Sequence, residues 1–303
     1  MSFSYNVKTE LCRLPKDSQC CVVSECYGIL LYCNTFSVRE VRIITGNQIL
    51  GQHLSEQFER AFSISFDIMP EKEKTGKQAY VISDPEKLGR IFETYGFSPG
   101  SLIAHHVNLG VLEEECCRKS FIRGAFLAGG AITDPEKSYH LELVTDHYNV
   151  SREMYSLMLD LGFSPKETAR GGNYVTYFKQ SSAIEDFLTT IGAPIHAMKL
   201  MSAKIEKDMR NSVNRKVNCD TANVSKTVDA SAAQINAIKK IELCGEFENL
   251  PEKLRQTANL RLENPELSIK ELAEISTPPA TKSCLSHRLR KIVELSQTLI
   301  AAK

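Results

Sequence analysis

The sequence predicts an α+β protein with two similar halves, each reading helix, strands, helix, strands, helix, and an all-α domain after them. The first observation is an internal repeat, because residues 20–36 align without a gap with residues 116–132. Both Cys-Cys pairs coincide in that alignment, and Gly28 coincides with Gly124. The second observation is a change after residue 198, where helical patterns and a basic excess replace the strand patterns. We expect the two halves to pack around a pseudo-twofold axis.

Two later segments extend the repeat in the same order. "VRIITGNQILGQHL" resembles "LELVTDHYNVSREM", and "YVISDPEKLGRIFETYGF" resembles "YFKQSSAIEDFLTTIGAP". Each of these segments reads as a strand followed by a helix. The order αββαββα is therefore expected twice.

In the first half, residues 20–34 are expected to form a helix and residues 38–45 an alternating strand. Residues 48–62 have helical period, because apolar side chains recur at every fourth position. That stripe consists of Leu50, Leu54, Phe58 and Phe62. Two more strands are expected, marked by Ile64, Phe66 and Ile68 and by Tyr80 and Ile82, with a last helix opened by Asp84.

The second half contains the helix of "FIRGAFLAGGAITD", residues 121–134. Gly124 and Ala128 lie one turn apart, and their small size lets two helix backbones approach closely. We expect Gly129 and Gly130 to end the helix in a left-handed turn. The later elements are marked by alternation at Leu141, Leu143 and Thr145, by the helical stripe Met154, Leu157, Met158 and Leu161, and by a hairpin turn at Gly171-Gly172.

The composition is that of an ordinary globular protein, with 42% hydrophobic and 24% charged residues. No apolar run approaches the ~20 residues that a membrane-spanning helix needs, and the start of the chain is charged throughout. We therefore expect a cytoplasmic protein with no membrane partner. The ten cysteines include no Cys-x-x-Cys pair, so no metal site is expected, and most should be small buried side chains with reduced thiols.

Charge is distributed unequally along the chain. Residues 1–198 hold 19 Lys+Arg against 24 Asp+Glu, whereas residues 199–303 hold 18 against 13. A basic excess in the C-terminal third fits a polyanionic partner there.

Residues 199–227 hold seven Lys+Arg against three Asp+Glu, with four asparagines among them. We interpret them as a basic helix that frays into an asparagine-rich linker. Two alternatives stay open, a solvated linker and a segment that contacts DNA phosphates. The candidates for such backbone contacts are Arg210, Arg215 and Lys216.

The C-terminal residues follow the pattern of a helix-turn-helix. "SIKE", residues 268–271, is a capping box that opens a short helix, in which Leu272 and Ile275 are expected to face inward. "STPPA" breaks that helix, and a longer one begins near Thr281.

The two sides of that longer helix differ in chemistry. At about 100° per residue, Leu285, Leu289 and Ile292 form one stripe that must pack inward. Arginine and lysine on the other side can read guanine edges in the major groove, and serine or histidine can contact bases or phosphates. The alternative is an ordinary solvated face. The candidate DNA-binding residues are Lys282, Ser283, Ser286, His287, Arg288, Arg290 and Lys291.

These patterns divide the chain into four segments. Residues 1–105 form an N-terminal segment with the first half, and residues 106–196 form the second half. Residues 197–227 form the basic linker helix and linker, and residues 228–303 form the helix-turn-helix domain that binds DNA.

Residues 20–195 resemble the LAGLIDADG homing-endonuclease fold. In that family one helix of each half lies along the pseudo-twofold axis and ends in an Asp that holds the catalytic metal ions. By alignment with that motif, the acid positions fall on Cys33 and Gly129. Glycine offers no ligand, and the soft sulfur of cysteine is unsuited to Mg²⁺. We therefore expect a degenerate motif with no catalytic residue and no metal, where the acids that could substitute are Glu25 and Asp134.

The two parts together resemble the WhiA family of Gram-positive bacteria. "MSFSYNVKTELCRLP", "FIRGAFLAGGAITDPEKSYHLE", "NRKVNCDTAN" and "KSCLSHRLRKI" carry that resemblance, which covers essentially the whole chain. It implies a sequence-specific DNA-binding transcription regulator of sporulation and cell division, nucleoid-associated, with no cofactor and no nuclease activity. Double-stranded DNA is the expected partner, and another transcription regulator is a second candidate. The alternatives are an active endonuclease and a scaffold whose N-terminal fold docks another regulator.

Overall fold

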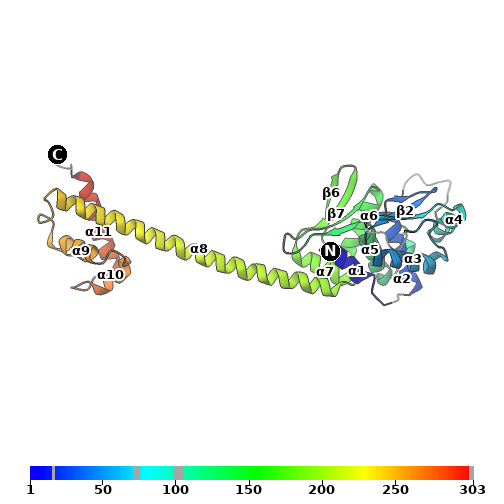
Figure 1. Cartoon of the computed structure of the whole chain (residues 1–303), viewed down its shortest axis with the longest axis horizontal. Coiled ribbons are helices and arrows are strands. Elements are labelled where there is room, and N and C mark those ends of the chain that lie inside the picture. Colours follow the sequence, from blue (N-terminus) through cyan, green and yellow to red (C-terminus); the bar gives the residue numbers. More distant parts are fainter. Residues whose placement is uncertain (16–17, 71–75, 98–104, 300–303) are drawn as a thin grey trace. The chain divides into compact units, whose positions relative to one another are not determined.

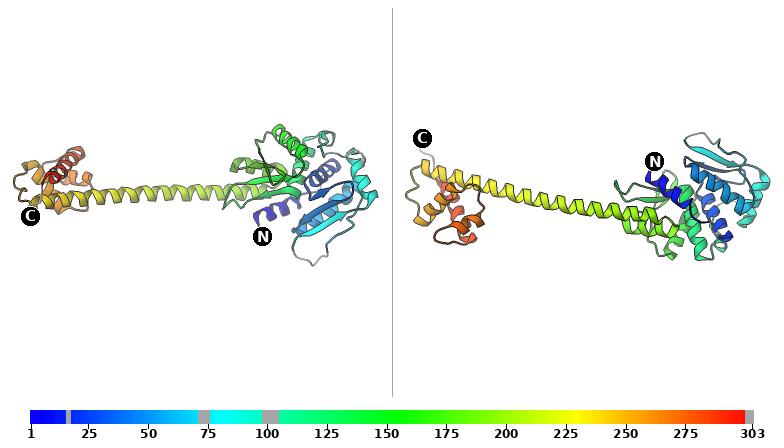
Figure 2. Two further views of the ribbon diagram at one scale, coloured as in Figure 1. Left: turned by 90° about the horizontal axis from the view of Figure 1, so that it is seen from above. Right: turned by 60° about the horizontal axis from the view of Figure 1, so that its bottom comes forward.

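The computed structural model describes residues 1–15, 18–70, 76–97 and 105–299 (Figure 1). The chain clusters into two compact units, Met1–Asp208 and Met209–Lys303. In the first unit, the half coloured blue to cyan lies next to the half coloured green (Figure 2). The expected class, α+β followed by an all-α part, is confirmed.

The first half forms an antiparallel sheet of order β1-β2-β3 together with three helices. Val41 pairs with Ile82 and Ile43 with Tyr80 across β2 and β3. Asn47 caps the second helix and Asp84 the third, each accepting two backbone N–H bonds. The elements are α2 (Gln19–Tyr32), β1 (Thr35–Phe36), β2 (Val41–Thr45), α3 (Gln48–Phe62), β3 (Gln78–Ile82) and α4 (Pro85–Thr94).

One strand expected in the first half is wrong. Ile64 and Phe66 are buried, but the backbone of residues 64–67 joins no ladder. Ile68 makes a single bridge to Val81, and its side chain is exposed. Alternation of apolar residues reports burial on one side, and a loop that packs on the core produces the same pattern.

The second half shows the whole αββαββα order, with a sheet of order β4-β5-β7-β6. The expected hairpin is confirmed, because Gly171 and Gly172 both have positive φ between two paired strands. The elements are α5 (Glu115–Gly129), β4 (Gly130–Ile132), β5 (Leu141–Thr145), α6 (Tyr148–Asp160), β6 (Lys166–Arg170), β7 (Asn173–Phe178) and α7 (Ser181–Ile191).

A helix before the first half was not expected from the sequence. It is α1 (Phe3–Leu11), capped by the hydroxyl of Ser2, which accepts the N–H of Tyr5. Val7 and Leu11 bury its inner face in the common core. A 3-10 turn, η1 (Leu109–Val111), precedes the second half.

Helices α2 and α5 touch backbone to backbone where two glycines face the opposite helix. A Cβ built on Gly28 would lie 2.0 Å from the carbonyl oxygen of Phe121, and one built on Gly124 would lie 2.0 Å from that of Glu25. Neither position has room for a methyl group. The expected close approach is confirmed at Gly124, and Gly28 makes the matching contact from α2. Ala128, the other small residue expected there, is only partly buried.

The end of α5 differs from the expectation of a left-handed turn. Gly130 has φ −86° and ψ 146°, so the helix passes directly into β4 with extended backbone. Gly129 is the last helical residue and does not adopt positive φ. Glycine is needed here for its missing side chain and not for its conformational freedom.

The second unit contains the end of α8 (Pro194–Leu243), α9 (Glu252–Glu263), α10 (Ile269–Ile275) and α11 (Lys282–Thr298). Its core joins Ile238 and Ile241 of α8 to Leu254 of α9 and to α11. Leu272 is buried as expected, but Ile275 is exposed, because α10 ends at this residue. No helix in the described part of the chain is long and apolar enough to span a bilayer.

The expected fraying of the basic segment is wrong, because α8 is one helix of 50 residues. Between Pro194 and Leu243 the sequence contains no further proline and no glycine. Asparagine disfavours a helix by less than about 0.7 kcal/mol relative to alanine, whereas proline costs about 3 kcal/mol. Four scattered asparagines therefore do not interrupt it.

We predict that Gly124→Ala lowers the free energy of unfolding of the Met1–Asp208 unit by about 1–3 kcal/mol or more, because the added methyl group forces the two helix backbones apart. Calorimetric unfolding of the full chain measures this change. The matched control is Gly89→Ala in α4, where a Cβ meets nothing within 4 Å. That substitution should stabilise by about 0.4–1 kcal/mol. Equal effects of the two substitutions would contradict the close approach.

Candidate nucleic-acid interface

Helices α10 and α11 are fixed at their starts by side-chain caps. The hydroxyl of Ser268 accepts the N–H of Glu271, and the Glu271 carboxylate accepts the N–H of Ser268 at 2.7 Å. The expected capping box is thus confirmed. Thr281 caps α11 by accepting the N–H of Cys284. Leu272 and Leu285 share a small apolar cluster that packs the two helices together.

The inward stripe of α11 is confirmed. Leu285, Leu289 and Ile292 are each at most 1% exposed. Since 3.6 residues make a turn, most of the side chains between them point toward solvent. The exposed candidates are Lys282, Ser283, Ser286, His287, Arg290 and Lys291.

Arg288 differs from the other candidates. It is only half-exposed, and its guanidinium donates to the hydroxyl of Thr257 on α9 at 3.5 Å. Arg290 remains exposed and pairs loosely with Glu294 one turn later, at 3.6 Å. An exposed pair of this kind is worth little, so Arg290 can exchange it for another anion.

Three lysines line a hollow of about 410 Å³ beside the start of α11. They are Lys226 of α8, Lys270 of α10 and Lys282 of α11. Arg261 lines the same hollow and is 1% exposed, with one guanidinium nitrogen donating to the carbonyl of Leu267 at 2.6 Å. Burial lowers the pKa of Arg261. Sequence reasoning missed all of these residues except Lys282, because only the folded unit brings the four helices together.

Arg210, Arg215 and Lys216 are all exposed on α8, but the helix does not place them on one face. At about 100° per residue, Arg215 lies some 140° around the helix from Arg210, and Lys216 lies a further 100° away. They are separate positive charges on the surface and not a single patch.

Cys33, at the first expected acid position, has its sulfur close to two backbone carbonyls. Its single S–H can donate to the carbonyl of Leu30 or to that of Thr35, each 3.1 Å from the sulfur. Burial raises the pKa of Cys33 to about 12. The group is therefore a neutral thiol at the end of α2 and not an anionic ligand.

The second acid position is closed by its surroundings. A Cβ on Gly129 would lie 2.5 Å from the carbonyl oxygen of Val144 and 3.0 Å from the ring of Tyr32. Tyr32 is itself buried. An aspartate at this position would require β5 and the Tyr32 side chain to move apart.

The two substitute acids lie in different surroundings. Glu25 is 1% exposed, and its two oxygens bind Arg123 of α5 and His53 of α3, each at 2.5 Å. Burial alone would raise the pKa of Glu25, but the hydrogen bond from His53 and the charge of Arg123 outweigh it, so the pKa is lowered. Asp134 is exposed after β4, where it caps a turn by accepting the N–H of Glu136.

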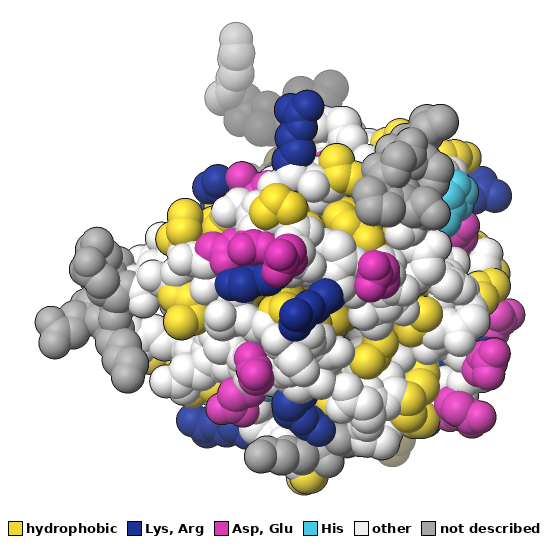
Figure 3. All heavy atoms as spheres, turned by 90° about the vertical axis from the view of Figure 1, so that its right-hand side faces the viewer, with side chains coloured by type: hydrophobic (Ala, Val, Ile, Leu, Met, Phe, Trp, Pro, Cys, Tyr) yellow, Lys and Arg dark blue, Asp and Glu magenta, His cyan; other side chains and the backbone are white. Residues whose placement is uncertain are grey.

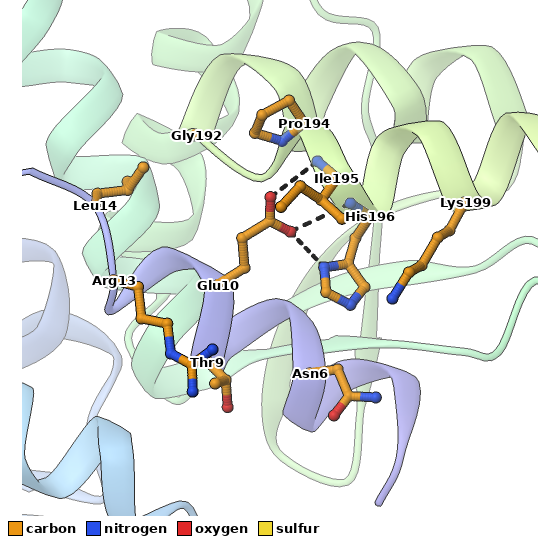
Figure 4. A pocket seen from close by; sticks show the side chains of 10 residues that line it. All are labelled: Asn6, Thr9, Glu10, Arg13, Leu14, Gly192, Pro194, Ile195, His196 and Lys199. Atoms are coloured by element: carbon orange, nitrogen blue, oxygen red, sulfur yellow. Dashed lines mark hydrogen bonds and ion pairs between the residues drawn. The ribbon is translucent and has the colours of Figure 1, made fainter.

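A hollow of about 590 Å³ lies where α1 meets the start of α8 (Figure 4). The carboxylate of Glu10 points at that helix start, where it accepts the N–H groups of Ile195 and His196 and pairs with the His196 ring. It thus acts as a cap supplied by another helix, which also complements the positive end of the helix dipole. Glu10, which lines this hollow, therefore stabilises the start of α8.

On the face of the Met1–Asp208 unit seen in Figure 3, Lys and Arg are mixed with Asp and Glu and with apolar side chains. No charge of one sign dominates that face.

The cysteines differ from the expectation in two ways. Cys21, Cys26 and Cys117 are buried, Cys12 and Cys33 pack against the core while partly exposed, and the other five are half-buried or exposed. In the described part of the chain, four of them form a group whose sulfurs all lie within 4.8 Å of one another: Cys20, Cys21, Cys116 and Cys117. The Cys-x-x-Cys spacing does not occur among these cysteines, so it could not predict the group. The sequence feature that indicated it was the coincidence of the two Cys-Cys pairs in the internal repeat.

Comparison with known proteins gives two matching family models. The WhiA LAGLIDADG-like domain matches residues 118–210, and the WhiA C-terminal HTH domain matches residues 213–296. The chain is 38% identical to the probable cell division protein WhiA of Ruminiclostridium cellulolyticum, over 99% of this chain and 98% of that protein. It is 36% identical to the protein of the same name in Clostridium acetobutylicum, over 99% and 98%. The crystal structure of full-length WhiA from Thermotoga maritima matches over the whole of both chains, with a TM-score of 0.59 and 26% identity.

We predict that Glu25→Gln destabilises the Met1–Asp208 unit by about 3–5 kcal/mol, because it removes the buried carboxylate charge that pairs with Arg123. Denaturant unfolding at pH 7 measures the loss. The exposed Glu115, which pairs with Lys119 one turn later, is the control, and Glu115→Gln should leave the midpoint unchanged.

The same variant has a pH signature. Because the folded-state pKa of Glu25 is lowered, its contribution is present above the ordinary carboxyl pKa near ~4.3 and is lost as pH falls through the folded value. The stability difference between wild type and Glu25→Gln should therefore shrink on acidification below about pH 4. A difference that stays constant down to pH 2 would contradict the ion pair.

Proposed function

Because the chain belongs to the WhiA family, we propose that it is a non-enzymatic, sequence-specific DNA-binding regulator of transcription in cell division and sporulation. The relatives carry the name of cell division proteins, and an HTH domain of this family spans residues 213–296. Double-stranded DNA is the proposed partner, and the nucleoid in the cytoplasm is the proposed location.

One observation carries the proposal: α11 buries an apolar stripe and exposes a polar, basic side from its first turn onward. A major groove about 12 Å wide admits one α-helix. Residues 282–291 span roughly 14 Å of helix, so the exposed side chains can reach several successive base pairs. We assign Arg290 and Lys291 to base edges, with Ser283, Ser286 and His287 beside them.

Phosphate contacts are proposed at the rim of the same helix. Lys226, Lys270 and Lys282 surround one hollow, and the start of α11 adds N–H groups that favour an anion. Arg288 bonds Thr257 of α9, so its main proposed role is to hold α11 in place and not to contact a base. Arg210, Arg215 and Lys216 are proposed to add separate, weaker backbone contacts.

The absence of nuclease activity is proposed on chemical grounds. Hydrolysis of a phosphodiester in this fold needs hard anionic oxygens that hold Mg²⁺ at both helix ends. One end carries the neutral thiol of Cys33, and the other is filled by Tyr32 and the Val144 carbonyl. Glu25 is occupied by Arg123 and His53.

A second role concerns the acidic N-terminal fold, which is proposed to dock another regulator. The mixed charges of the face in Figure 3 fit a protein partner better than a DNA backbone. Removing residues 199–303 should abolish DNA binding and leave capture of that regulator unchanged.

We predict that Arg290→Ala weakens binding to a specific duplex by about 1–3 kcal/mol, because one bidentate base contact is lost. The probe is a duplex that the wild-type chain selects from random-sequence DNA, measured by fluorescence anisotropy at fixed salt. The matched control is Lys239→Ala, which removes an exposed positive charge from α8 outside the proposed face. Equal binding by wild type and Arg290→Ala would remove Arg290 from the site.

We predict that the purified chain leaves supercoiled plasmid intact with Mg²⁺ or Mn²⁺. Gly129→Asp should not create cleavage, because the new side chain meets Val144 and Tyr32. Gel electrophoresis of the plasmid measures nicking. Nicking that disappears in Asp134→Asn would show that the fold still cuts DNA through this acid.

A further inference from the structure

The first turns of α2 and α5 bring four thiols together. Cys20 and Cys21 are the second and third residues of α2, and Cys116 and Cys117 hold the same places in α5. Their four sulfur atoms all lie within 4.8 Å of one another. Each half of the repeat therefore supplies one pair, and the two pairs meet where the helices start.

The spacing of the sulfurs fits one tetrahedral ion. Four thiolates around Zn²⁺ at about 2.3 Å place the sulfurs roughly 3.8 Å apart. Closing the group from 4.8 Å to that spacing requires shifts of about 1 Å, which side-chain rotation supplies. A set of four sulfur ligands in tetrahedral arrangement is typical of zinc.

The surroundings also suit a negatively charged metal site. Zn²⁺ with four thiolates carries two negative charges, and the positive ends of both helix dipoles point at it. Neither Ser18 nor Glu114, the residues that precede the two helices, makes a side-chain cap bond, so these side chains do not compete with sulfur for the first-turn N–H groups. The Ser18 hydroxyl lies 3.1 Å from the Cys20 sulfur, and Ser24, one turn later, binds the Cys20 carbonyl at 2.8 Å.

The cysteine group is partly open to solvent and partly enclosed by the protein. Cys20 and Cys116 are exposed, whereas Cys21 and Cys117 are buried. An ion can thus reach the site from solvent and become enclosed by the inner pair. Four cysteines that served only as core side chains would not leave two of their sulfurs at the surface.

We propose that Cys20, Cys21, Cys116 and Cys117 bind one zinc ion that ties the two halves of the N-terminal fold together. All four positions of the ion are filled by protein ligands, so the site is structural and leaves no place for a substrate. Binding replaces the four thiol protons by one Zn²⁺ and involves no oxidation. The site is independent of the proposed DNA-binding function.

The test uses the full chain, purified under reducing conditions, loaded with Zn²⁺ and dialysed. Elemental analysis should give one zinc per chain. Loading with Co²⁺ instead should give thiolate-to-cobalt charge transfer and the visible bands of a tetrahedral ion. Removing zinc with a chelator should lower the unfolding midpoint, because an ion that binds only the folded state stabilises it by mass action.

The variant Cys20→Ser/Cys116→Ser should lose the zinc and the cobalt spectrum. Both positions are exposed, so this variant should still fold, with the unfolding midpoint of the chelator-treated wild type. The matched control Cys219→Ser/Cys244→Ser also removes two thiols and should keep one zinc per chain. Substoichiometric zinc in the wild type, or an octahedral cobalt spectrum, would overturn the proposal. The same holds if the four cysteines form disulfides between the helices that exclude zinc under these conditions.

Discussion

Two helix backbones meet without side chains between them where Gly28 of α2 faces Phe121 and Gly124 of α5 faces Glu25. That contact sets the distance between the halves, because any side chain at either glycine would strike a carbonyl oxygen. It also brings Glu25 within reach of Arg123 across the helix pair, and His53 of α3 completes the buried ion group. A buried charge of this kind is tolerated only while its partners stay in place, so the ion group penalises other arrangements of the helices.

The starts and the ends of helices α2 and α5 carry different side chains. At their starts, matching cysteine pairs converge into a group that suits a metal ion. At their ends, at the positions where the resemblance to LAGLIDADG proteins would place acids, Cys33 bonds nearby carbonyls and Gly129 is covered by Tyr32 and Val144. The close packing of the two helices therefore has a mechanical role here. We propose contact with DNA for α11 in the other unit.

The sequence predicted those parts in which local pattern and burial agree. Residues 48–62 form α3 at the expected bounds, the Gly171-Gly172 hairpin is present, and Leu289 is buried as its wheel position requires. The wrong strand at residues 64–68 and the unbroken α8 show where the pattern was ambiguous. The lysine hollow, the closure of Gly129 and the cysteine group depend on contacts between distant segments, so no single segment could reveal them.

We expect the α2–α5 contact to be the most stable part of the N-terminal fold, to which the other elements are attached. Native-state hydrogen exchange of the full chain tests this directly, because it reports the opening free energy of each amide. We expect residues 22–31 of α2 and 118–128 of α5 to exchange only through global unfolding of their unit, and more slowly than α1 and α4. Exchange in α2 and α5 as fast as in α1 would contradict the claim.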